Sequence, residues 1–114
     1  MAHFLLRYTL APDYLDRRAA LRDAHLSLAW EATGTGLLLG GAVGDPPAEA
    51  LLLFDSEAAA TAFAGADPYV TQGLVTGWRV DRWITVVGEN AATPVRRPEE
   101  MVGDDGLEPP TFSV

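Results

Sequence analysis

Arg18, Arg22 and His25 are the residues whose types and spacing best suggest chemistry, because they interrupt an apolar helix face. Their spacing of i, i+4 and i+7 stacks them along one line of a helix predicted at residues 14–33. The apolar arc around them is formed by Tyr14, Leu15, Leu21, Leu26, Leu28 and Trp30. Burying a charge without a partner is costly. We therefore expect an anionic group, either a carboxylate of the protein or a ligand, to meet these side chains.

A structural interpretation of this helix face is also open, and the helix pattern alone favours it. Arg18 and Arg22 can bury their carbon chains while their charged ends reach water. His25 can be a core histidine whose hydrogen bonds are satisfied within the protein. The functional alternative is acid–base chemistry at the imidazole, beside guanidinium groups whose planar donors suit carboxylates.

Two further segments contain residues that fit either a site or an ordinary structural role. Asp67 precedes Pro68, which is typical of a helix cap followed by the first helical residue. Tyr69 fits a packing aromatic as well as a ligand contact. Gly41, which follows Gly40, fits a β-bulge as well as a backbone that a ligand approaches closely. None of these residues indicates catalysis by itself.

Hydrophobic periodicity predicts the elements that must position these residues. Strands are predicted at residues 3–10, 37–43, 49–54 and 78–87. Helices are predicted at residues 14–33 and 57–64, the second capped by Ser56 and closed by Gly65. This β-α-β-β-α-β order is typical of a ferredoxin-like α+β fold, with both helices on one face of a four-stranded antiparallel sheet. Leu5, Trp83 and Val87 fall on the other face, and we expect a second subunit to cover it.

The bulk composition indicates one small globular domain. Hydrophobic residues make up 48% of the 114 residues, and no apolar run approaches the ~20 residues of a membrane span. The net charge of −8 makes nucleic acid and anionic membranes poor partners. The chain has no cysteine, no metal-ligand triad and no phosphate-binding glycine loop, so we expect neither a metal nor a cofactor. The N-terminus lacks the features of a secretory signal, and we expect a cytoplasmic protein.

The composition changes after Glu89, where the predicted domain of residues 1–89 ends. Residues 90–114 contain four prolines, two glycines and five acidic residues against two arginines. Such a segment has few apolar groups to bury. We therefore predict a disordered acidic tail at residues 90–114.

Four stretches of the chain resemble the YCII-related family in order and spacing. They are Phe4-Leu5-Leu6-Arg7-Tyr8, Leu21-Arg22-Asp23-Ala24-His25-Leu26, Gly36-Leu37-Leu38-Leu39-Gly40-Gly41, and Ala66-Asp67-Pro68-Tyr69-Val70 with Gly73. The most specific parts are the Arg-x-x-His of the first predicted helix and the Asp-Pro-Tyr after the second. The resemblance extends to Trp83-Ile84-Thr85-Val86 and does not cover residues 90–114. One departure is Gly41-Ala42, where the family often has Gly-Pro.

The resemblance implies a dimeric α+β barrel in which one histidine and one aspartate form the active-site pair. At the matching positions this chain has His25 and Asp67. A carboxylate directed at an imidazole fixes its tautomer and raises its basicity, which suits proton transfer near neutral pH.

Two functions of different classes follow from these observations. In the first, the protein is an isomerase- or lyase-like enzyme that transfers a proton on a small anionic metabolite. His25 and Asp67 would be its catalytic pair, and Arg22, Arg18, Tyr69 and Gly41 would bind the substrate. In the second, the same pocket belongs to a non-catalytic homodimer that binds a small anion and has a regulatory role.

Overall fold

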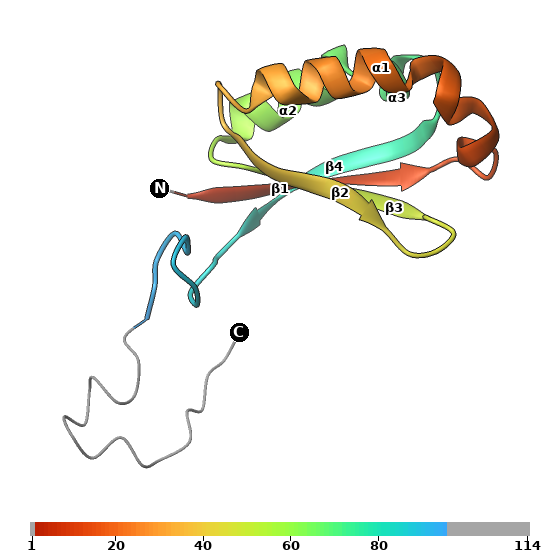
Figure 1. Ribbon diagram of the computed structural model, residues 1–114. Helices are drawn as coiled ribbons and strands as arrows, with labels where there is room; N and C mark the ends of the chain where they lie inside the picture. The colour runs from red at the N-terminus through yellow and green to blue at the C-terminus, as the bar shows by residue number, and fades with distance from the viewer. Residues whose placement is uncertain (1, 96–114) are drawn as a thin grey trace. The chain divides into compact units, whose positions relative to one another are not determined.

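The computed structural model describes residues 2–95, in which four strands form one antiparallel sheet (Figure 1). The strands are β1 (His3–Leu10), β2 (Leu37–Val43), β3 (Glu49–Phe54) and β4 (Val75–Trp83). The helices are α1 (Tyr14–Ala32), α2 (Glu57–Ala66) and the single turn α3 (Pro68–Thr71). The strand order is β2-β3-β1-β4, and the helices lie on one face of the sheet (Figure 1). The predicted ferredoxin-like α+β fold is therefore confirmed.

The core lies between the sheet and the helices because alternate strand residues point to the same face. The register places Leu6 of β1 between Leu52 of β3 and Val80 of β4 on the helix side. Tyr8 and Phe54 share this side and are almost completely buried. The neighbouring rows of the sheet therefore support the helices through large apolar side chains.

Helix α2 is longer than its prediction, and this affects the position of Asp67. Ser56 caps the helix as predicted, with its hydroxyl oxygen accepting a hydrogen bond from the Ala59 N–H at 3.2 Å. The helix does not stop at Gly65 but continues to Ala66. The backbone N–H of Asp67 still donates to the carbonyl of Phe63 at 2.9 Å. Asp67 therefore joins two helices instead of following a glycine stop.

Strand β4 differs from its prediction at both ends. The alternation of side chains predicts a strand at residues 78–87, whereas β4 spans Val75–Trp83. Its register with β1 runs from Leu10 opposite Val75 to His3 opposite Trp83, with a bulge between Thr9 and Leu10. Strand β1 begins at His3, so residues after Trp83 have no β1 residue opposite them. Val87 therefore lies outside the sheet face on which the sequence predicts it.

The face of the sheet opposite the helices has a row of apolar side chains beside charged ones such as Arg7, Arg79 and Asp81. Trp83 is 48% exposed on this face, and Leu5, Leu51 and Leu53 are half-buried beside one another. Such a row leaves apolar area in contact with water in a single chain.

The described residues divide into a compact unit, Ala2–Trp83, and a second segment that begins at Ile84. Within the second segment, the Thr93 N–H donates to the Thr85 carbonyl at 3.0 Å, and the Val95 N–H donates to the Val86 carbonyl at 2.9 Å. The predicted boundary at Glu89 falls inside this segment. Of the predicted tail at residues 90–114, the part after residue 95 lies outside the described residues.

Candidate active site

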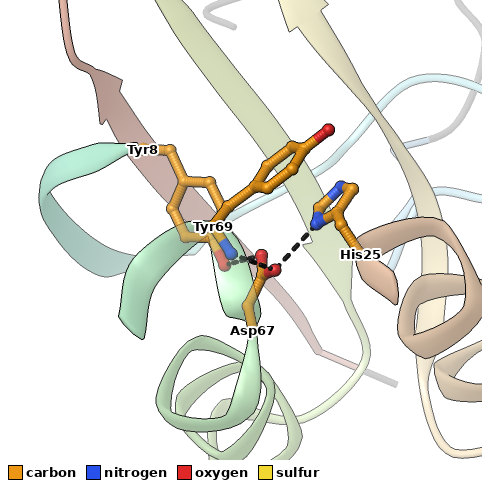
Figure 2. Close-up of polar contacts among 4 residues, drawn as sticks. All are labelled: Tyr8, His25, Asp67 and Tyr69. Carbon is orange, nitrogen blue, oxygen red and sulfur yellow. Dashed lines mark hydrogen bonds and ion pairs between the residues drawn. The ribbon is translucent and has the colours of Figure 1, made fainter. Parts of the chain in front are cut away.

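Asp67 is the buried centre of the candidate site. It caps α3, with Pro68 in the first turn and the Tyr69 N–H donating to Asp67 Oδ1 at 3.0 Å. The junction of two helices directs this carboxylate into the core, where the side chain is fully buried. Its Oδ2 accepts a hydrogen bond from the Tyr8 hydroxyl at 2.7 Å, and His25 Nδ1 lies 2.8 Å from Oδ1 (Figure 2). These partners compensate the charge for the water lost on burial.

His25 reaches Asp67 from the middle of α1. Its side chain is 15% exposed, because aromatic rings enclose it on two sides. The imidazole lies parallel to the Tyr69 ring, with 3.8 Å between ring centroids and 4° between ring planes. The Phe63 ring meets it edge to face, with centroids 6.2 Å apart. The ring plane of His25 is therefore fixed by packing as well as by its hydrogen bond.

The contact with Asp67 determines which nitrogen of His25 is available for chemistry. A carboxylate accepts hydrogen bonds, so Nδ1 is the donor and the neutral ring has its lone pair on Nε2. Nε2 lies at the end of the ring away from Asp67 (Figure 2), and His25 lines a cavity. Such an arrangement can accept a proton from a bound molecule, or return one, while Asp67 keeps the ring oriented.

Tyr8 is a part of the site that sequence reasoning missed. The alternation of β1 identifies it only as a core residue, and its hydroxyl is the second donor to Asp67. Burial, followed by the negative charge of Asp67, raises the pKa of Tyr8 above its usual value of 10.0. The phenol therefore stays protonated and keeps donating. A tyrosine on a buried strand face needs a partner for its hydroxyl, and this is the signal that could have identified it.

A cavity of about 450 Å³ lies between α1 and the side of the sheet formed by β2 and β3. Arg18, Arg22 and His25 line it from α1, and Tyr69 lines it from α3. Leucines and alanines of α1, β2 and β3 supply most of the remaining lining. Asp67 does not line the cavity but lies behind His25. The volume is within the range of about 300–1,000 Å³ that is usual for small-molecule sites.

Arg18 and Arg22 give one side of this cavity a positive charge. Neither residue forms an ion pair with an acidic side chain of residues 2–95, whereas Arg17 on the same helix lies 3.8 Å from Asp13. The Arg18 guanidinium lies 5.7 Å from the centroid of the Tyr14 ring, a cation–π contact. The charge of both arginines therefore remains available to an anion.

Gly40 and Gly41 form part of the cavity wall on β2, but they are not equivalent. Gly40 lies opposite Leu52 and therefore shares the helix side of the sheet, whereas Gly41 lies opposite Leu51 on the other side. A Cβ atom at Gly40 would lie 3.3 Å from Leu52 Cγ, and one at Gly41 would meet no atom within 4 Å. The sheet is therefore tightly packed at Gly40 and open at Gly41, and the close approach of a ligand to Gly41 stays a prediction.

The six residues singled out from the sequence thus lie around one cavity or directly behind it. Within residues 2–95, no group of three or more histidine, cysteine, aspartate or glutamate side chains is placed to hold a metal ion. No helix of the described segment combines the length and the hydropathy needed to cross a bilayer.

Comparisons with known proteins support the fold. No family model and no curated protein matches the chain. It is similar to the structure of 5-chloro-2-hydroxyhydroquinone dehydrochlorinase from Burkholderia phenoliruptrix AC1100 in complex with 2,5-dihydroxybenzoquinone. That similarity has a TM-score of 0.59 at 23% identity and covers 71% of this chain and 92% of the other. A candidate antibiotic biosynthesis monooxygenase from Deinococcus radiodurans has a TM-score of 0.47 at 20% identity, covering 79% of this chain and 97% of the other. At 23% identity, the similarity to the dehydrochlorinase establishes a shared fold.

Proposed function

We propose that this protein is an enzyme that transfers a proton on a small anionic metabolite. The observation that carries the proposal is the 2.8 Å contact between Asp67 Oδ1 and the Nδ1 atom of His25, a residue that lines the cavity. His25 is the general acid–base, and Asp67 is a positioning residue that does not line the cavity. A purely structural histidine would not need a cavity beside its ring that is large enough for a ligand of several heavy atoms.

The charge of the cavity supports an anionic substrate. Arg22 and Arg18 line it without an acidic partner in residues 2–95, and their two positive charges exceed the single negative charge of the His25–Asp67 pair with a neutral imidazole. A carboxylate on the substrate would bind the guanidinium groups, placing the adjoining carbon near His25. The apolar lining suits a hydrocarbon or aromatic body.

Two similarities support the same reaction class. The Arg-x-x-His and Asp-Pro-Tyr segments resemble the YCII-related family, whose histidine and aspartate are regarded as its active-site pair. The dehydrochlorinase with the same fold removes hydrogen chloride, an elimination that begins or ends with the loss of a proton. We therefore propose an isomerase- or lyase-like reaction.

The proposal includes a homodimer in which a second copy covers the open face of the sheet. The apolar side chains of that face, including the exposed Trp83, favour such an interface. The family resemblance likewise implies a dimeric α+β barrel.

The test is turnover of a panel of carboxylated, enolisable metabolites in heavy water, followed by mass spectrometry. The wild type is expected to release a product, or at least to incorporate deuterium at a carbon atom of one metabolite. His25→Ala is expected to lower that rate by about 10²–10⁴-fold, the usual contribution of acid–base catalysis, with an unchanged circular dichroism spectrum. Asp67→Asn should cost less, because an amide oxygen still accepts from Nδ1.

The non-catalytic alternative predicts a different result. Metabolites would bind to the wild type and to His25→Ala without product or deuterium incorporation in either. Equal rates for the wild type and His25→Ala would likewise reject the enzyme.

A further inference from the structure

The hydroxyl group of Tyr69 is a buried donor without a partner. Tyr69 is 3% exposed, and its hydroxyl oxygen makes no hydrogen bond with any residue in the described part of the chain. The Tyr14 hydroxyl lies near enough for its charge and its hydrogen-bonding capacity to raise the pKa of Tyr69, but the two hydroxyls do not meet the geometry of a hydrogen bond. Buried polar groups are nearly always paired, and an unpaired one costs free energy. A partner supplied by a ligand would explain why this group is tolerated.

The Tyr69 hydroxyl and His25 Nε2 point in the same direction. The two rings lie parallel at 3.8 Å, and both residues line the cavity. Figure 2 shows the Tyr69 oxygen and the second His25 nitrogen at the ends of their rings away from Asp67. A donor and a base therefore face the same space side by side. One substrate could contact both of them at once through two of its atoms.

The charge around Tyr69 suits a donor that stays protonated. Burial is the main cause that raises the pKa of Tyr69 to about 12, the Tyr14 hydroxyl adds to the rise, and Arg22 and Arg18 act in the opposite direction. The phenol therefore holds its proton at neutral pH. The same two cations stabilise negative charge that develops on an oxygen beside it.

We infer that the Tyr69 hydroxyl donates a hydrogen bond to a carbonyl oxygen of the substrate while His25 exchanges a proton at the neighbouring carbon. The inference rests on the proposed function and specifies its substrate class more closely. The substrate class becomes an enolisable carbonyl compound that also carries a carboxylate. The carboxylate binds Arg22 and Arg18, and an apolar or aromatic body occupies the leucine-lined remainder of the cavity.

The proton balance of this step needs no further reactant. The carbon–hydrogen bond breaks, and its proton bonds to His25 Nε2. The electron pair of that bond forms the carbon–carbon double bond of an enolate, and the π pair of the carbonyl group moves onto its oxygen. The Tyr69 hydroxyl stabilises that oxygen without giving up its proton. In an isomerisation the proton returns from His25 to a different atom of the substrate. In an elimination a neighbouring substituent leaves with its bonding pair, and His25 later passes the proton to water.

The test compares two probes that differ at the carbonyl carbon. Phenylpyruvate has a carboxylate, a phenyl ring and an enolisable carbonyl group, and 3-phenylpropionate lacks the carbonyl group. The wild type is expected to bind phenylpyruvate more tightly, by roughly two- to tenfold, the range of a hydrogen bond between uncharged groups. Tyr69→Phe is expected to abolish this preference, and the control variant Arg17→Gln, at a residue that does not line the cavity, is expected to keep it.

The preference is a ratio of two affinities measured on one sample, so a partly unfolded variant does not distort it. Because the lost hydroxyl has no partner in the empty protein, Tyr69→Phe should also melt at the same temperature as the wild type or higher. The inference is overturned if the wild type shows no preference for phenylpyruvate, or if Tyr69→Phe retains it.

Failure of this inference and failure of the proposed function give different results. Loss of turnover in His25→Ala with an intact preference in Tyr69→Phe keeps the enzyme and rejects the Tyr69 contact. Loss of the preference in Tyr69→Phe, with no turnover or deuterium incorporation by the wild type, keeps the Tyr69 contact and rejects catalysis.

Discussion

His25 and Tyr69 are connected through one oxygen atom of a third residue as well as through their stacked rings. Asp67 Oδ1 lies 2.8 Å from the Nδ1 atom of His25 and accepts a hydrogen bond from the backbone N–H of Tyr69 at 3.0 Å. The two rings also contact each other directly, with 3.8 Å between their centroids. Because α1 and α3 are both held at this point, a change in one side chain is expected to alter the orientation of the others.

Tyr8→Phe tests the buried end of this network. The variant removes the hydrogen bond at 2.7 Å to Asp67 Oδ2 and leaves a buried carboxylate oxygen without that donor. We expect the free energy of unfolding at neutral pH to fall by about 1–3 kcal/mol. Urea denaturation followed by circular dichroism would measure it, and an unchanged midpoint would show that the bond contributes nothing to stability.

The raised pKa values of Tyr8 and Tyr69 predict a loss of stability at alkaline pH. Below pH 10 both phenols are protonated in the folded and unfolded chains, so their contribution is constant. Above pH 10.0, the usual pKa of tyrosine, the unfolded chain ionises first, while the folded pKa of Tyr69 is about 12 and that of Tyr8 is also raised. The free energy of unfolding therefore falls as the pH rises, by up to about 1.4 kcal/mol per pH unit for each tyrosine. Tyr8→Phe should have a shallower slope than the wild type between pH 10 and pH 12.

Arg22→Gln tests the anionic character of the ligand. Arg22 lines the cavity, whereas Arg17 donates to the Gln72 carbonyl at 2.6 Å and does not line it. Since Arg22 is exposed, we expect weaker phenylpyruvate binding by roughly two- to fivefold, the range of an exposed ion pair. Arg17→Gln makes the same change in net charge and should leave the affinity unchanged. Equal losses in both variants, measured by titration calorimetry, would indicate a general effect of charge.

Gly40→Ala and Gly41→Ala form a second matched pair. A Cβ atom at Gly40 would press on Leu52 at 3.3 Å, and Leu52 lines the cavity. We expect Gly40→Ala to weaken binding and Gly41→Ala to leave it intact. Gly41→Ala should also raise the free energy of unfolding by roughly 0.5–1 kcal/mol, as expected for alanine replacing glycine in a strand. The reverse order of affinities would show that the ligand approaches β2 at Gly41.

Leu53→Glu tests the proposed dimer. Leu53 lies opposite Leu5 in the middle of the open sheet face and does not line the cavity. A charge there is expected to convert a dimer into a monomer, as measured by light scattering after size-exclusion chromatography. The control is Leu15→Glu, since Leu15 is 47% exposed on α1. A monomeric wild type would reject the dimer directly.

The sequence predicts the architecture well because the fold depends on patterns that are local. Alternating strands and the residues that begin α2 and α3 determine the element order without knowledge of distant contacts. The end of β4 could not be predicted in this way, because it depends on where β1 begins. Tyr8 was missed for a similar reason, since its partner Asp67 lies 59 residues away in the chain.

The apolar arc of α1 predicts more buried side chains on this helix than the structure has. Leu15 and Trp30 belong to the arc, but they are 47% and 74% exposed. The arc is wider than the surface that α3 and the sheet offer to the helix. Periodicity shows which face of a helix is apolar. It does not show where a cavity, and not a packed neighbour, lies against that face.

The cavity under α1 makes the stability of this protein depend on the concentration of its ligand. Tyr14 is the buried residue of the helix, and the space between α1 and β2 is available to a bound molecule. A molecule that binds there stabilises only the folded chain, by about 2.7 kcal/mol at a hundred times its Kd. By mass action, a cell that accumulates this ligand would protect the protein from proteolysis, and one that exhausts it would degrade the protein sooner.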